Sequence, residues 1–98
     1  MIRAVSFHEA AEGELNEAAD FYDLECPGLG AAFIDELQRT LETIVRFPEA
    51  SPLIQERVRR KILIKFPYAV IYSLRETQIR ILAIAHARRR PFYWRGRQ

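Results

Sequence analysis

The pattern of apolar and polar residues has a clear period over most of this chain. Residues 2–7 alternate, with Val5 and Phe7 on either side of the polar Ser6, which predicts a short opening strand. From His8, which stands where a helix cap or turn is expected, the period changes to that of an amphipathic helix. Its apolar positions are Ala11, Leu15, Ala18, Ala19 and Tyr22.

A second helix is predicted after a break. Residues 26–30, Cys-Pro-Gly-Leu-Gly, end the first helix because proline lacks an N–H donor and glycine permits positive φ. The second helix ends near Phe47 and Pro48. One stripe of it carries Phe33, Ile34, Leu37, Leu41, Ile44 and Val45. The two helices are expected to form a hairpin.

Three runs typical of β-strands follow a loop that contains Pro48 and Pro52, namely residues 57–66, 68–75 and 78–86. Alternate residues of a strand point to opposite faces of the sheet. In the first run we expect the apolar parity to face the core: Val58, Ile62, Ile64 and Phe66. We expect the other parity to form a basic outer face: Arg59, Lys61, Leu63 and Lys65.

The third run is apolar on both parities after Arg80, which predicts an interior, central strand. The order β-α-α-β-β-β predicts an α+β fold. In this fold an antiparallel sheet, to which the N-terminal strand is added, packs against the helical hairpin, and a short C-terminal tail follows. The 98 residues, of which 49% are hydrophobic, fit one domain over residues 1–98.

Composition narrows the function classes. Cys26 is the only cysteine, so an intramolecular disulfide is excluded and a reducing compartment is favoured. The N-terminus lacks the apolar core of a signal peptide, and no run of about 18 apolar residues occurs, so we predict a cytoplasmic protein with no membrane contact. The two histidines and one cysteine have no ligand spacing, so we predict neither a metal nor a cofactor.

Charge is segregated along the sequence. Residues 1–50 hold eleven of the thirteen acidic residues and three of the fifteen basic ones, a net of −8, whereas residues 51–98 hold twelve basic and two acidic residues, a net of +10. Residues 87–95, Ala-Arg-Arg-Arg-Pro-Phe-Tyr-Trp-Arg, mix arginines with aromatic rings. Guanidinium groups bind phosphates or carboxylates, and aromatic rings stack or fill apolar pockets. The sequence therefore predicts an acidic partner.

The sequence resembles toxins of the RelE/ParE superfamily of bacterial type II toxin–antitoxin systems, and the ParE-like branch most closely. The resemblance rests on the order and spacing of short segments, which are residues 17–22, 27–30, 33–37, 46–50, 58–60, 66–72 and 84–94. RelE-like toxins usually carry an arginine after the tyrosine of the middle strand, where this chain has Ala69 after Tyr68. This departure argues against RelE-type RNA cleavage.

The resemblance implies a toxin that a flexible cognate antitoxin neutralises in a heteromeric complex, and a ParE-like toxin that inhibits DNA gyrase by protein binding. We assign target binding to the cations and rings of the tail and the first run: Arg59, Lys61, Arg88, Arg89, Arg90, Tyr93 and Trp94. We assign antitoxin binding to the basic sheet face: Arg59, Lys61, Lys65, Arg75 and Arg80. Both assignments require these cations to gather on one docking surface.

Two alternatives stay open. The first is a metal-free, RelE-type endoribonuclease that acts on mRNA in the ribosome. In this alternative His86 or Tyr93 transfers protons, and phosphate is held by Arg59, Lys61 and Arg88. The second is a non-toxic module that binds nucleic acid through its basic half. Individual residues also have structural alternatives: His86 ends a strand and can order the tail by hydrogen bonding. The three rings at positions 92–94 can pin the tail against the sheet.

Overall fold

The computed structural model describes residues 4–98, so Ile2 and Arg3 of the predicted opening strand lie outside the described residues. Two helices and five strands follow in the order β1 (Ala4–Phe7), α1 (Glu9–Glu25), α2 (Leu29–Arg46), β2 (Leu53–Gln55), β3 (Val58–Ile62), β4 (Tyr68–Leu74) and β5 (Gln78–His86). Both helices are confirmed. His8 caps α1, since its Nδ1 accepts a hydrogen bond from the N–H of Ala10 at 3.0 Å.

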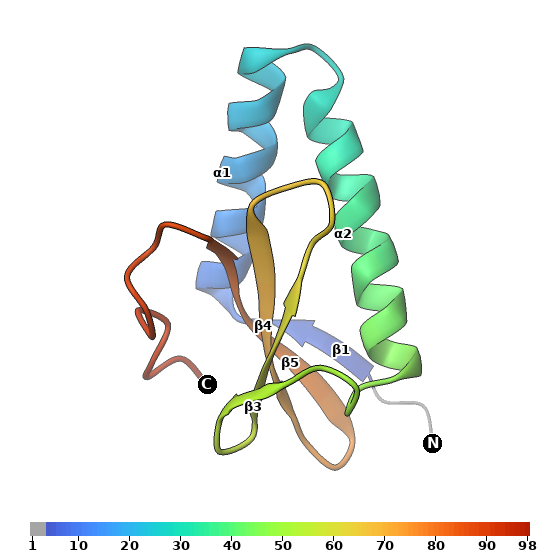
Figure 1. Cartoon of the computed structure of the whole chain (residues 1–98), viewed down its shortest axis with the longest axis vertical. Helices are drawn as coiled ribbons and strands as arrows, with labels where there is room; N and C mark the ends of the chain where they lie inside the picture. Colours follow the sequence, from blue (N-terminus) through green and yellow to red (C-terminus); the bar gives the residue numbers. More distant parts are fainter. Residues whose placement is uncertain (1–3) are drawn as a thin grey trace.

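The helical hairpin is closed by one carboxylate and two glycines. Asp23 Oδ1 accepts hydrogen bonds from the N–H groups of Gly28 and Gly30, at 3.2 and 2.8 Å. Gly28 has a φ of 91°, in the left-handed region that favours glycine. A Cβ at Gly30 would lie 2.5 Å from the carbonyl oxygen of Ala19, so the close approach of the two helices depends on this glycine. The tip of the hairpin projects beyond the sheet (Figure 1).

The five strands form one sheet in the order β1-β5-β4-β3-β2. The α+β class and the hairpin-on-sheet arrangement are therefore as predicted, with two differences. β1 pairs with β5 in parallel, while the other pairs are antiparallel. A short strand, β2, lies inside the predicted loop, where three residues are too few to show an alternating pattern. β5 lies between β1 and β4, so it is interior as predicted, although β4 holds the middle of the sheet.

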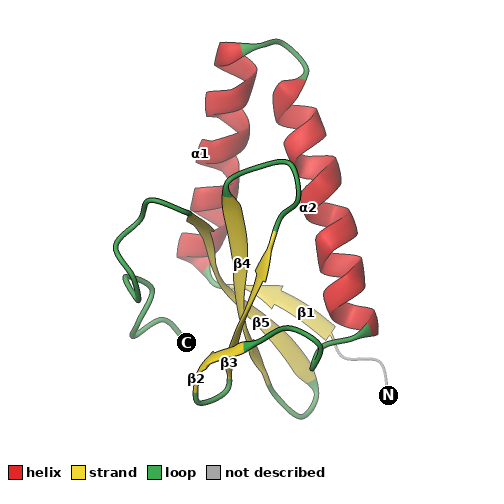
Figure 2. Ribbon diagram, viewed as in Figure 1, coloured by secondary structure: helices red, strands yellow, loops and turns green. Residues whose placement is uncertain are grey.

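The sheet has apolar residues on both faces. The helices cover one face, which we call the helix face, and its core includes Phe33, Leu37, Ile44, Val70, Tyr72, Ile81 and Ile84. The C-terminal tail after β5 covers part of the other face, which we call the tail face, where Trp94 packs with Ala69, Ile71, Leu82 and Ala83. The tail runs beside the sheet as an irregular loop (Figure 2). Both parities of β5 are apolar because both of its faces are covered. The register of β5 shifts opposite Ile71 and Tyr72.

The predicted faces of the first β-run are wrong for its middle, although Val58 and Phe66 pack against core residues as predicted. β3 ends at Ile62, and Ile62 and Ile64 are 64% and 93% exposed, whereas Leu63 is buried. Glu36, a buried carboxylate of α2, accepts hydrogen bonds from the N–H groups of Ile64 and Lys65, the latter at 2.9 Å. Glu36 therefore supplies acceptors for two backbone N–H groups in the turn between β3 and β4.

The residues of β3 that we expected to form a basic outer face therefore lie on the helix face. Arg59 is paired with Tyr72 and Lys61 with Val70, and paired residues share a face of the sheet. Both Tyr72 and Val70 belong to the helix-face core. Arg60 and Ile62 lie on the tail face, opposite Ile71 and Ala69.

Candidate functional site

A polar cluster fastens the C-terminal tail to α1 and β5. Glu14 of α1 accepts hydrogen bonds from the Tyr93 hydroxyl at 2.8 Å and from both terminal nitrogens of Arg97 at 3.0 and 3.1 Å. It also accepts the N–H of Ile84 at 3.0 Å. The side chains of Arg97 and Glu14 are 18% and 13% exposed, so this ion pair is largely shielded from water. We call Glu14, Tyr93 and Arg97 the tail clamp.

The tail clamp lies where the β1–β5 pairing stops. β1 pairs with β5 only as far as Ile81, so the following residues of β5 have no strand on that side. Glu14 accepts a hydrogen bond from the N–H of Ile84, and Arg97 donates one to the carbonyl of Leu82 at 3.0 Å. These side chains therefore supply backbone partners that a longer β1 would have supplied.

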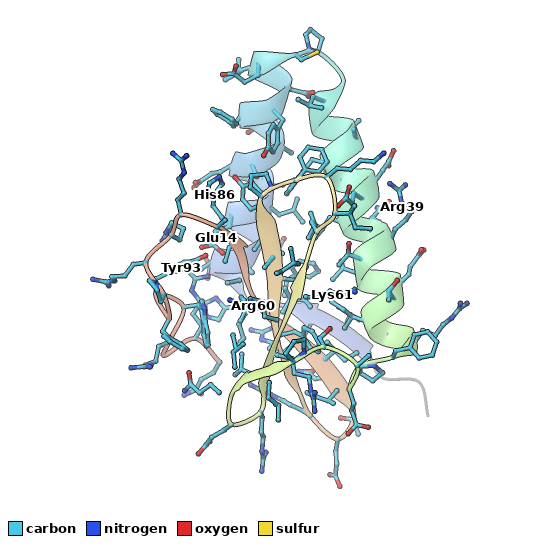
Figure 3. The ribbon with its side chains drawn as sticks, in the orientation of Figure 1. Glu14, Arg39, Arg60, Lys61, His86 and Tyr93 are labelled. Atoms are coloured by element: carbon cyan, nitrogen blue, oxygen red, sulfur yellow. The ribbon has the colours of Figure 1, made fainter. Side chains whose placement is uncertain are left out.

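Tyr93 is held as a neutral phenol. Burial raises the pKa of its hydroxyl well above the usual range, and the hydrogen bond to Glu14 raises this pKa further. The guanidinium carbons of Arg89 and Arg97 lie 3.9 and 5.1 Å from the centre of its ring. Figure 3 shows Glu14 and Tyr93 together beside β5. Trp94 is 5% exposed, so it and Tyr93 pin the tail to the sheet, while Phe92 is 40% exposed.

Beside the tail, the tail face of the sheet forms a groove of about 350 Å³, which we call the tail groove. Its floor is made by Ile54, Ile62, Ala69, Ile71 and Ala85, and its walls include Phe92 and Trp94 of the tail. Arg60 of β3 stands on one side, and Arg89 and Arg90 stand on the other. No aspartate or glutamate is among the residues of the described chain that line it.

The sequence-predicted cations do not gather on one surface, which corrects that expectation. Arg59 on the helix face donates to the carbonyls of Glu49 and Ser51, at 3.0 and 2.7 Å, and so fastens the loop before β2. Lys61 is half-buried on the same face. Arg60 and Lys61 leave β3 toward opposite faces of the sheet (Figure 3).

The remaining predicted cations lie at three further places. Lys65 stands beside α2, near Asp35 and Arg39, and Arg75 follows β4. Arg80 of β5 donates to the Ser6 hydroxyl, to the carbonyl of Phe7 and to the carbonyl of Gln98, at 3.2, 2.9 and 3.1 Å. Of the residues assigned to the target, only those after β5 lie together: Arg88, Arg89, Arg90, Tyr93 and Trp94.

The candidate proton-transfer residues have structural partners. His86 Nδ1 accepts a hydrogen bond from the N–H of Arg88 at 3.0 Å, so His86 orders the turn that begins the tail. Its ring lies edge-on to Tyr68, 4.9 Å between centres. The Tyr93 hydroxyl donates its hydrogen bond to Glu14. A tyrosine whose pKa is raised is a poor general base near neutral pH, so Tyr93 is not activated for that role.

Sequence reasoning missed Glu14, Arg97 and Arg60. A signal for Glu14 was present, because its spacing of three and four residues from Ala11 and Ala18 places it on the buried side of α1. Arg97 had no comparable signal. Within residues 4–98, no three His, Cys, Asp or Glu side chains are grouped as a metal site would require. Neither of the helices described is long and apolar enough to cross a bilayer.

A hairpin of two helices on a small mixed sheet, closed by a basic aromatic tail, defines the class of small α+β toxins that the sequence resembles. Residues 5–91 match the family described as "ParE toxin of type II toxin-antitoxin system, parDE", and the chain belongs to this family. The match ends before Tyr93 and Arg97, so it does not include two residues of the tail clamp.

Among solved structures, the chain is similar to one described as "Chromosomal ParDE TA system from P. aeruginosa". The TM-score is 0.76 and the identity 16%, over 87% of this chain and 96% of that chain. At this identity the likeness establishes the fold. No curated protein matches the sequence.

Proposed function

We propose that this chain is a toxin neutralised by a cognate antitoxin, and that it inhibits DNA gyrase by binding it rather than by cleaving nucleic acid. Membership of the ParE family supports the toxin role, and the described similarity to a ParDE system supports an antitoxin partner. The observation that carries the binding mechanism is the tail groove, an apolar floor between arginines with no acidic lining residue.

The proposed target surface keeps the predicted residues of the tail and leaves out Arg59 and Lys61, which lie on the helix face. Arg88, Arg89 and Arg90 form an exposed turn directly after β5. The tail clamp and Trp94 hold the chain that follows, so the turn is fixed at both ends. A fixed cationic turn loses little conformational freedom on binding, which favours affinity.

Growth and supercoiling assays test this function. The chain is expressed alone and together with the adjacent antitoxin reading frame, and we expect growth arrest only without the antitoxin. Arrested cells should contain relaxed or broken DNA and intact messages. New 5′ ends on cellular messages, seen by primer extension, would instead identify an endoribonuclease. Equal growth in both cultures would contradict the toxin role.

Replacing Arg88, Arg89 and Arg90 together with alanine separates binding from folding. Arg88 and Arg90 are exposed, so each of these changes should alter the free energy of unfolding by less than about 0.5 kcal/mol. Arg89 stacks on the Tyr93 ring, and its loss should cost about 0.5–1 kcal/mol. We expect the purified triple variant to lose inhibition of gyrase supercoiling and to keep its cooperative thermal unfolding. Retained inhibition would show that the target surface lies elsewhere.

A further inference from the structure

We propose that Phe92 is the apolar anchor of the target surface, and that its ring enters an apolar pocket on the target protein whose rim carries carboxylates. This inference rests on the proposed function, because it names the residue on which target binding depends and the kind of pocket that receives it. The family match ends at residue 91, so Phe92 is a feature of this chain outside the matched segment.

The backbone at Phe92 is held in a conformation that bulky residues rarely adopt. Its φ is 61°, in the left-handed region, where the Cβ of an L-residue comes too close to a backbone oxygen. Among residues 4–98 the other positive φ angles belong to Gly28 and Gly96. Gly96 lies in the same tail, so the tail has glycine at one left-handed position and a bulky ring at the other. A bulky ring at a strained position points to a use for the ring.

The ring of Phe92 contributes little to holding the tail in place. Trp94 is 5% exposed and Tyr93 belongs to the tail clamp, whereas Phe92 is 40% exposed and belongs to the core of neither sheet face. The N–H of Arg95 donates to the carbonyl of Phe92 at 3.0 Å and closes a turn around the ring. An exposed ring on such a fixed turn loses little conformational freedom on binding, which favours affinity.

Cations surround the ring of Phe92. The guanidinium carbon of Arg95 lies over it, 5.0 Å from its centre. Arg90, which lines the tail groove together with Phe92, is exposed and makes no side-chain hydrogen bond or ion pair within residues 4–98. Aromatic rings and arginines are enriched where protein interfaces bind most strongly. A matching pocket is therefore apolar inside and carries carboxylates at its rim, where they pair with these guanidinium groups.

A stacked nucleobase is the other ligand that an exposed ring can bind. Stacking requires an open ring face, but the guanidinium of Arg95 covers one face of Phe92. The ring of Trp94 is also inclined to it by 55°, with 5.6 Å between the ring centres. Insertion of the exposed edge into a pocket needs neither of these neighbours to move. The contacts of the ring therefore favour a protein partner.

Purified variants of the full chain test the anchor. Phe92→Gly removes the ring, and we expect it to bind DNA-free gyrase about tenfold or more weakly than the unaltered chain, measured by biolayer interferometry. The matched control is Phe47→Gly, because Phe47 is likewise exposed, at 57%, but lies at the end of α2 with a φ of −133°. This control should bind as the unaltered chain does. Equal binding by Phe92→Gly, or an equal loss in Phe47→Gly, would overturn the anchor.

Thermal unfolding of alanine and glycine variants at the same two positions tests the backbone strain. Glycine relieves the left-handed strain that alanine keeps, so Phe92→Gly should unfold about 4–8 °C higher than Phe92→Ala. At Phe47 the φ is negative, and the order should reverse because glycine leaves more freedom to the unfolded chain. The same order at both positions would refute the strain and the proposal with it. Loss of cooperative unfolding in Phe92→Gly would show that the ring holds the tail, and would also overturn the proposal.

The same assays separate this inference from the proposed function. An unaltered chain that neither binds gyrase nor inhibits supercoiling contradicts the proposed function. If the unaltered chain inhibits gyrase and Phe92→Gly inhibits it equally well, the anchor alone is refuted. A twelve-nucleotide single-stranded DNA that the unaltered chain binds, and that Phe92→Gly binds about tenfold more weakly, would assign the ring to a nucleobase and overturn the protein pocket.

Discussion

Removal of the Glu14 carboxylate is the most direct test of how the tail is held. In Glu14→Ala the Tyr93 hydroxyl, the Ile84 N–H and the Arg97 guanidinium all lose their acceptor. Breaking a buried ion pair by removing one partner costs about 3–5 kcal/mol. Because both side chains keep some contact with water, at 13% and 18% exposed, we expect the lower end, about 3 kcal/mol.

The matched control is Glu17→Ala, which removes an exposed carboxylate from the same helix. This control should change the free energy of unfolding by less than about 0.5 kcal/mol. Tyr93→Phe is an intermediate case, because Glu14 keeps its contacts with Arg97 and Ile84. Losing one hydrogen bond to a charged group should cost about 1.5 kcal/mol.

Urea unfolding followed by circular dichroism gives the three free energies. Trp94 is the only tryptophan of the chain, belongs to the tail and is buried against the sheet, so its emission reports on the docking of the tail. In Glu14→Ala we expect the emission to shift to longer wavelength in native buffer, and the unfolding midpoint to fall by more than about 10 °C. Equal stability of Glu14→Ala and Glu17→Ala within about 0.5 kcal/mol would refute the tail clamp.

Three further predictions address the rest of the fold. Since the pKa of Tyr93 is raised in the folded state, its contribution to stability is complete below pH of about 10 and is lost as pH rises above that value; denaturant titrations up to pH 11 should show a smaller alkaline loss in Tyr93→Phe. Gly30→Ala forces a methyl group against a carbonyl of α1 and should cost about 1–3 kcal/mol, whereas Gly13→Ala, which points into open space, should stabilise the helix by about 0.5–1 kcal/mol; thermal unfolding that ranks them otherwise contradicts the helix contact. Glu36→Ala leaves two backbone N–H groups after β3 without their acceptor and should cost about 1–3 kcal/mol, and unchanged amide hydrogen exchange in that turn would argue against this role.

The helices could be predicted because their signals are local. The three- and four-residue period and the Pro-Gly break are properties of neighbouring residues, and they placed both helices and the cap at His8 correctly. The end of β3 was not predicted, because a partner of the turn that follows it is far away in the sequence. Glu36 of α2 binds the N–H groups of Ile64 and Lys65 after Ile62, and nothing in the alternation of residues 57–66 signals this contact.

The tail was predictable only in part, for a related reason. Its mixture of arginines and aromatic rings indicated a docked segment, and Trp94 and Tyr93 are docked on the tail face. Which rings face the protein was left open, because the choice depends on where Glu14 lies in space. Arg60 was overlooked because the predicted strand faces had the wrong parity.

Many of the charges that are segregated along the sequence bind one another or backbone groups in the folded chain. Three acids of the negative half have partners within the fold: Asp23 closes the hairpin, Glu36 binds backbone N–H groups after β3, and Glu14 binds Arg97 from the positive half. Arg59 and Arg80 likewise donate hydrogen bonds to backbone carbonyl groups. Much of the apparent attraction for an acidic partner is therefore satisfied within the fold. Among residues 4–98, Arg60 and Arg90 beside the apolar floor of the tail groove have no such partner, so an external carboxylate can pair with them.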